Sequence, residues 1–166
     1  MIMLKKSGFL FLVIAVFLSF SENALQANEK PQDAMDRVRT FSIKILEKSL
    51  QSENAFIRSA AARAAGESEY SGLIPFLKKA AKDSYHTTRL FALQGIKKIS
   101  LDEARAISIH MSRDPNIWVR GAAIEMLGEL GDGALGNIIQ PHLKSPDRTV
   151  RYAAAGALFK LGDENQ

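Results

Sequence analysis

The 166-residue sequence contains no cysteine, which excludes disulfides, thiolate chemistry and metal sites with cysteine ligands. The chain must therefore be held together by its apolar core. It also has no Asn-x-Ser/Thr acceptor, so no N-linked glycan is expected. The formal net charge is only +4, and residues 28–166 alone would carry +3, from 20 basic and 17 acidic residues. A charge of this size does not indicate binding to nucleic acid or to an anionic membrane.

The sequence also lacks the residue groupings that catalysis and metal binding require. None of its three histidines, His86, His110 and His142, is followed by glutamate, and no two of them share a helix face. The run 131–136 fits the glycine pattern of dinucleotide-binding loops. That pattern needs a preceding strand and an acidic residue about 20 positions later, where Gly156 stands. We therefore predict no catalytic residue, no metal ligand and no cofactor.

Long apolar runs are confined to the first 27 residues. Two lysines precede an apolar run of 12 residues, 9–20, and a polar stretch ending in Ala24-Leu-Gln-Ala27 follows it. This order predicts a secretory signal peptide over 1–27, cleaved after Ala27, and hence a periplasmic or secreted protein. Cleavage after Ala24 is an alternative. Because a spanning helix needs about 20 apolar residues, an uncleaved membrane anchor is less favoured.

What the sequence does contain is a motif that returns every 31 residues. An arginine marks each copy, at Arg58, Arg89, Arg120 and Arg151, and the surrounding residues recur most clearly over 114–131 and 145–162. A fixed period in this range indicates stacked supersecondary units, each of which buries its apolar side against the next. The predicted fold class is therefore all-α, a solenoid of about four two-helix repeats over 32–66, 67–99, 100–131 and 132–162.

The segments between glycine and proline residues have helical spacing, and none shows the two-residue alternation of a strand. Pro31 suits the first turn of a helix, whereas Pro141 is expected to kink a helix near Asn137. The expected helices cover 31–50, 54–65, 71–82, 86–99, 102–113, 116–130, 133–144 and 147–161.

The second helix of each repeat has predicted ends and a predicted buried stripe. Asn54, Asn116 and Asp147 suit N-caps, and Gly131 and Gly162 suit the left-handed conformation after a helix. Four columns, at offsets of 4, 4 and 3 residues, should lie on one buried face. These columns are Ile57, Thr88, Val119 and Val150; Ala61, Ala92, Ala123 and Ala154; Ala65, Ile96, Leu127 and Leu158; and Ser68, Ile99, Leu130 and Leu161.

The frame Asp-x-x-x-x-Val-Arg-x-Ala-Ala-x-x-Leu-Gly-x-Leu-Gly resembles the HEAT-like repeat of the phycobilin-lyase type. The resemblance covers about 32–162 and implies a HEAT-like repeat domain over 28–166. It also implies a structural ladder in which loop aspartates bind helix arginines, weaker where Ser52 and Ser145 replace aspartate. The ladder would use Asp83, Asp114, Arg58, Arg89, Arg120 and Arg151. Contact of these arginines with a ligand is the alternative.

The resemblance further implies that the second helices line a concave surface. On a helical wheel, the side opposite the buried stripe carries the large apolar residues Phe56, Leu90, Trp118, Tyr152 and Phe159. Exposed tryptophan and tyrosine are favoured anchors at interfaces. We predict that these residues bind a partner, with local packing against their own repeats as the alternative.

These features favour an exported, non-catalytic scaffold or adaptor that binds another protein or peptide through its concave face. HEAT-like repeats also serve enzymes and enzyme helpers, so a lyase-like or enzyme-assisting role is an alternative. A third is binding of nucleic acid or another anionic polymer through the arginine column, which the small charge disfavours. A weak homodimer through the C-terminal end is also predicted. Membrane contact is expected only through an uncleaved signal segment.

Overall fold

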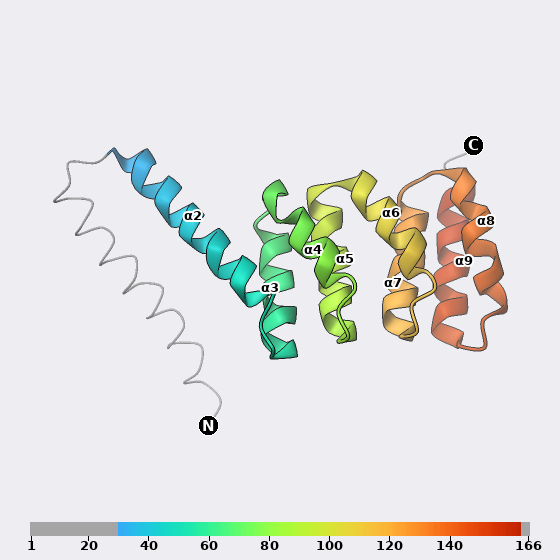
Figure 1. Cartoon of the computed structure of the whole chain (residues 1–166). Coiled ribbons are helices and arrows are strands. Elements are labelled where there is room, and N and C mark those ends of the chain that lie inside the picture. Colours follow the sequence, from blue (N-terminus) through green and yellow to red (C-terminus); the bar gives the residue numbers. More distant parts are fainter. Residues whose placement is uncertain (1–29, 164–166) are drawn as a thin grey trace, which may run out of the picture. The chain divides into compact units, whose positions relative to one another are not determined.

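The computed structural model describes residues 30–163 (Figure 1). All regular secondary structure in this range is helical, so the all-α prediction is confirmed. The signal peptide predicted over 1–27 lies outside the described residues and stays a prediction. Across 30–163, no helix combines the length and the apolarity that a membrane span requires.

The chain divides into two compact units, with the boundary after Lys44, inside the first predicted repeat. The described part of the first unit is the beginning of α2 (Pro31–Ser49), which starts at the expected proline. Met35 and Phe41 of α2 are more than half exposed. Two large apolar side chains of this helix are thus open to solvent.

The second unit, which starts at Ile45, has two layers of helices. The second helices α3, α5, α7 and α9 stand side by side, and α4, α6 and α8 lie along one side of that row (Figure 1). This is the arrangement of an α-solenoid. The elements are α3 (Ala55–Glu67), η1 (Ser71–Leu73), α4 (Ile74–Ala80), α5 (His86–Ile99), α6 (Leu101–Met111), α7 (Ile117–Glu129), η2 (Gly133–Leu135), α8 (Gly136–Ile139), η3 (Gln140–Lys144) and α9 (Arg148–Asp163).

Side-chain caps start the second helices, as predicted. The Oδ1 atoms of Asn54, Asn116 and Asp147 accept hydrogen bonds from backbone N–H groups in the first turns of α3, α7 and α9. Tyr85 occupies the same position before α5 and provides no side-chain cap. There, Oδ1 of Asp83 accepts a hydrogen bond from the Tyr85 N–H instead.

The ends of the helices match the predictions less well. Gly131 has φ of 68°, which confirms the left-handed turn after α7. The same prediction for Gly162 is wrong, because α9 continues through it to Asp163 and the chain makes no turn there. After α3 the left-handed residue is Glu69, with φ of 51°. The helix predicted to end at Ala65 therefore continues for two more residues, to Glu67.

Proline breaks the first helix of the last repeat, as expected. The segment predicted as one helix over 133–144 is divided into η2, the four-residue α8 and η3, with Pro141 near the start of η3. Proline cannot donate the hydrogen bond that an α-helix needs, and its ring clashes with the preceding turn. The layer opposite α9 is therefore irregular.

The core follows the predicted stripe along α5, α7 and α9. The alanine column is buried in all four repeats, and the large side chains of the neighbouring columns, such as Ile96 and Leu127, are fully buried. Two predicted members are exposed. Ile57 is 47% exposed, because α3 is the first of the four second helices in this unit. Ser68 is exposed because it lies beyond the last residue of α3.

The second helices are not equally spaced along the row. The pairs α3–α5 and α7–α9 pack closely, whereas α5 and α7 make much less contact (Figure 1). A Cβ added to Gly66 would lie 2.3 Å from the Cα of Gly95, and one added to Gly128 would lie 2.5 Å from the Cα of Ala157. At the equivalent positions between α5 and α7 stand Lys97 and Met126, which line a hollow of about 470 Å³. Side-chain size therefore sets the spacing.

We predict that Gly66→Ala destabilises the protein by about 1–3 kcal/mol, because the added methyl group overlaps the backbone of α5. Gly156→Ala is the matched control. Nothing lies within 4 Å of the Cβ position there, so its better helix propensity should stabilise the protein by about 0.5–1 kcal/mol. Urea unfolding of both variants tests this. Equal effects of the two substitutions would contradict the close approach of α3 to α5.

A second prediction concerns a buried hydroxyl. Among the described residues, Oγ1 of Thr88 is buried without a hydrogen-bond partner. Its column carries valine in the next two repeats, Val119 and Val150. Thr88→Val should therefore stabilise the protein by about 1–2 kcal/mol, since it removes a desolvated polar group and keeps the shape.

The reciprocal control is Val119→Thr, which should destabilise the protein by a similar amount because Val119 is fully buried. Denaturant midpoints of the two single variants give the comparison. A Thr88→Val protein that unfolds more easily than wild type would mean that the hydroxyl has a stabilising partner.

Candidate functional site

The arginine column connects each second helix to two loops. Nε and Nη2 of Arg58 donate to the carboxylate of Asp83 in the following repeat, at 2.5 and 2.8 Å. Nε and Nη2 of Arg89 likewise donate to the carboxylate of Asp114, at 2.7 and 2.6 Å. Each Nη1 donates to backbone carbonyls of the arginine's own loop. These paired hydrogen bonds to a carboxylate are the strongest type that an arginine forms.

The aspartates of this ladder also shape their own loops. Oδ1 of Asp83 and Oδ1 of Asp114 accept hydrogen bonds from the N–H groups of Tyr85 and Asn116. The hydrogen bonds from Arg58 hold the pKa of Asp83 below its ordinary value, against the opposing effect of burial. The same bonds raise the pKa of Arg58, and those to Asp114 raise the pKa of Arg89. The ion pair of Arg58 and Asp83 is therefore charged at neutral pH.

Among the contacts of the described residues, the last two arginines of the column bind only their own loops. Nη1 of Arg120 donates to the carbonyls of Asp114 and Pro115, and Nη1 of Arg151 donates to those of Ser145 and Pro146. Ser145 stands where Asp83 and Asp114 stand in the preceding repeats. Its Oγ accepts a hydrogen bond from the Asp147 N–H, so it keeps the loop contact and lacks the contact to arginine.

The predicted partner-binding residues are exposed, with one exception. Phe56, Trp118, Tyr152 and Phe159 are 72%, 59%, 68% and 70% exposed, whereas Leu90 is half-buried. They come from α3, α7 and α9, and all except Phe159 lie in the first two turns of their helices. Leu90, in α5, is less open to solvent than the other four.

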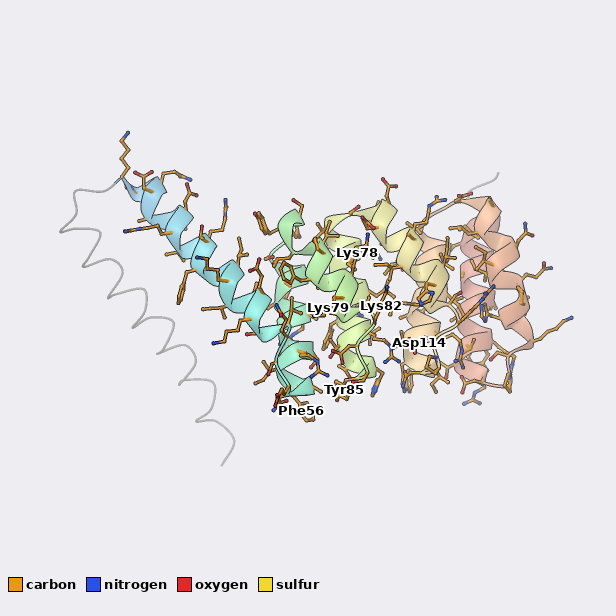
Figure 2. All side chains as sticks on the ribbon, in the orientation of Figure 1. Phe56, Lys78, Lys79, Lys82, Tyr85 and Asp114 are labelled. Carbon is orange, nitrogen blue, oxygen red and sulfur yellow. The ribbon has the colours of Figure 1, made fainter. Side chains whose placement is uncertain are left out.

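Two of the exposed rings have neighbours that orient them. Phe56 meets Tyr85 edge to face, with ring centroids 5.7 Å apart, and the two rings lie together at the ends of α3 and α5 (Figure 2). The guanidinium of Arg148 lies 5.9 Å from the centroid of Tyr152. The rings are thus partly held in place while most of their surface stays open.

A basic groove runs between α4 and α6, in the layer of first helices. We define it by Lys78, Lys79, Lys82, His110 and Arg113, which line two adjoining hollows of about 780 and 470 Å³. Figure 2 shows Lys78 and Lys79 on α4 and Lys82 in the turn that follows it. Lys78 pairs with Glu103 of α6 at 2.8 Å. Alanine and methionine side chains form part of the lining.

Sequence reasoning missed this groove. The Lys-Lys-Ala-Ala-Lys run at 78–82 is visible in the sequence, but the groove exists only because α4 and α6 are separated at its position. The sequence pattern of the second helices recurs in every repeat, so the predicted sites were taken from those helices. The basic position of Lys82 recurs as Arg113 and Lys144, whereas Lys78 and Lys79 correspond to Ile109 and His110 in the next repeat.

Ionic contacts near the C-terminal ends of the second helices link neighbouring repeats. Glu129 of α7 pairs with Lys97 of α5 and, at 3.3 Å, with Lys160 of α9. The hydrogen bond from Lys97 is the main cause of the lowered pKa of Glu129. Within residues 30–163, no group of three or more His, Asp or Glu side chains is placed to hold a metal ion.

The architecture defines an α-solenoid, and comparison with known proteins identifies its repeats. The family described as HEAT repeats matches residues 105–166. A chain in the structure of the complex of CpcE and CpcF of phycocyanin lyase from Nostoc sp. PCC7120 is similar in fold, with a TM-score of 0.51 and 22% sequence identity. The match covers 74% of this protein and 65% of that chain, so this protein spans about two thirds of its length. No curated protein gave a significant sequence match.

Residues 105–166 thus match HEAT repeats, and the fold of the chain is similar to that of a chain in the phycocyanin lyase complex. The resemblance stated from the sequence is thereby confirmed. The family match covers the repeats whose motif is clearest, and the weaker motifs at 52–66 and 83–99 lie outside it.

The ion pair of Asp83 should make stability depend on pH. The folded pKa of Asp83 is lowered, so its contribution is present above the unfolded pKa near 4 and is lost as pH falls through the folded value. Asp83→Asn should therefore lower the folding equilibrium constant several-fold at pH 7. The difference from wild type should shrink in acid.

Asp147→Asn is the control for this prediction, because asparagine caps a helix as well as aspartate does and Asp147 has no arginine partner among the described contacts. Urea unfolding at several pH values from 7 down to about 3 measures both variants. A difference between Asp83→Asn and wild type that is independent of pH would show that the lost contact is not ionic.

Proposed function

We propose that this protein is an exported, non-catalytic scaffold that binds a partner protein through the face of its second helices, the concave face in HEAT-like solenoids. The observation that carries the proposal is the exposure of Phe56, Trp118, Tyr152 and Phe159, each with more than half of its surface open to solvent. Large aromatic side chains dominate the binding energy of many protein interfaces. Four of them on one set of helices favour a role in recognition.

The order of the N-terminal segment supports export. Its basic residues, apolar run and alanine-containing end have the sequence of a secretory signal peptide. In such a setting, a repeat domain without cysteine is held by its core and its ladder alone. The partner is therefore expected in the periplasm or outside the cell.

A lyase-like or enzyme-assisting role is the second candidate. The similar solved structure is a complex of two named subunits of phycocyanin lyase, and its likeness to this protein lies in the fold. That similarity favours association with a second protein under either function. The basic groove between α4 and α6 would then be available for an acidic substrate or partner.

Binding of nucleic acid through the arginine column is disfavoured. The fork nitrogens of Arg58 and Arg89 are already engaged by Asp83 and Asp114. Half of the column therefore has its charge balanced within the solenoid. A polyanion would gain little from these two residues.

The test is a capture experiment with the full chain carrying a C-terminal tag, from an extract of the cell envelope and periplasm. We expect wild type to capture a partner and the double variant Trp118→Ala/Tyr152→Ala to lose it, with affinity reduced roughly 10-fold or more. Leu101→Ala/Leu143→Ala is the matched control, since these residues are 59% and 40% exposed in the layer of first helices. That variant should keep the partner.

Equal capture by all three proteins would move the binding site away from the aromatic residues. An untagged copy expressed in the same cells tests the proposed weak homodimer. Phe159 and its small, exposed neighbours Ala155 and Gly156 form the outer surface of α9 proposed for that contact. Capture of the untagged copy by wild type, and its loss in Phe159→Ala, would support self-association.

A further inference from the structure

The ladder of arginines and aspartates is one carboxylate short at Arg120. In the two preceding repeats, Nε and Nη2 of the arginine bind both oxygens of an aspartate in the next repeat. Arg120 has the same place in its helix and makes the same Nη1 contacts with its own loop. Its Nε and Nη2 have no hydrogen-bond acceptor within residues 30–163, because Ser145 occupies the aspartate position.

The serine keeps one function of the aspartate and lacks the other. Its Oγ accepts a hydrogen bond from the Asp147 N–H at 3.3 Å, as Asp83 and Asp114 do for Tyr85 and Asn116. The loop is therefore built in the usual way. A hydroxyl is too short to replace a carboxylate that reaches a guanidinium in the neighbouring repeat. What is absent is a carboxylate that could accept hydrogen bonds from Nε and Nη2 of Arg120. The hydrogen bond within the loop is kept.

Further positive charge surrounds this position. Burial lowers the pKa of His142 below its ordinary value, and the charges of Arg120 and Arg113 lower it further. Arg113 also lines the basic groove between α4 and α6, which is about 780 Å³ in volume at that end. The two carboxylate oxygens of Asp114, whose backbone carbonyl accepts from Arg120, are bound by Arg89. Arg120 and Arg113 thus bring two positive charges close to His142.

We propose that Arg120, together with Arg113 and His142, forms a binding site for a carboxylate that comes from outside the chain. The ligand would occupy the position of the absent aspartate and accept two hydrogen bonds from Nε and Nη2. The planar fork of arginine matches a carboxylate in this arrangement, and the half-buried setting strengthens the contact relative to the surface. His142 and Arg113 would contribute donors from the side of η3 and the loop after α6.

This site is independent of the exposed aromatic residues. It would serve equally for a carboxylate side chain of a protein partner and for a small free carboxylate. Its chemistry is the same in both cases. The experiment below therefore distinguishes the two sources.

The test uses the full chain with ¹⁵N-labelled arginine and follows the Nε–H signal of Arg120 by NMR. Sodium acetate is added, with sodium chloride at equal ionic strength as the reference. In wild type we expect the Arg120 signal to shift and saturate with acetate and not with chloride. The Nε–H signals of Arg58 and Arg89 should not move, because their carboxylate positions are filled.

Ser145→Asp is the decisive variant, since it supplies the missing carboxylate from within the chain. Its Arg120 signal should be displaced before any acetate is added and should then respond at least tenfold less. Ser145→Asn is the matched control, of nearly the same size and without charge, and it should titrate like wild type. A wild-type signal that moves alike with acetate and chloride would overturn the proposal. So would equal acetate responses in wild type and Ser145→Asp.

A blocked Gly-Glu-Glu-Gly peptide, compared with Gly-Gln-Gln-Gly, distinguishes the sources. Saturation by the glutamate peptide at a concentration at least tenfold below that of acetate would assign the site to a carboxylate side chain of a protein. Saturation at an equal concentration of carboxylate would assign it to a small free acid. Both results support the site, whereas a response to the glutamine peptide as strong as that to the glutamate peptide would contradict it.

Discussion

The contact between an arginine and the loop before its own helix is the interaction on which the stacked repeats depend. Arg58, Arg89, Arg120 and Arg151 each donate from Nη1 to the carbonyls of that loop. This contact fixes the direction in which the guanidinium fork points. A repeat that supplies an aspartate is then joined to its predecessor through charge-assisted hydrogen bonds, while the apolar stripe supplies most of the burial. Without the loop contact, the long arginine side chain would lose conformational entropy in meeting its partner.

Much of the fold could be predicted because a repeated unit shows each structural requirement several times. The caps Asn54, Asn116 and Asp147 and the alanine column follow from local chemistry that is legible in one helix at a time. The prediction for Gly162 was wrong although Gly131 occupies the same repeat position. After Gly131 the chain turns into a further helix, and no further helix follows Gly162 among the described residues. The repeat period therefore predicts which residues share a local motif, but not which elements surround each copy.

The candidate sites depend on distances between helices, and this is why the sequence revealed them unequally. Exposure of Trp118 and Tyr152 could be read from a helical wheel, because it depends on one helix face. The groove beside Lys82 and Arg113 could not, since it depends on the separation of α4 from α6. The substitution of Ser145 for aspartate was visible in the sequence. Its effect on Arg120 required the geometry of the other repeats, in which both fork nitrogens bind the next loop.

The alternation of tight and loose contacts between second helices means that the solenoid has two different periods. Its sequence motif recurs every repeat, but its helix packing recurs every second repeat, with Gly66 against Gly95, then Lys97 beside Met126, then Gly128 against Ala157. The smallest segment that can be deleted or inserted with matched helix packing is therefore a pair of repeats. Removing the second repeat would set Gly66 against Met126, and removing the third would set Lys97 against Ala157, so the adjoining surfaces would no longer match. Removing or adding two together would keep every junction matched, so such a protein is expected to change length by pairs.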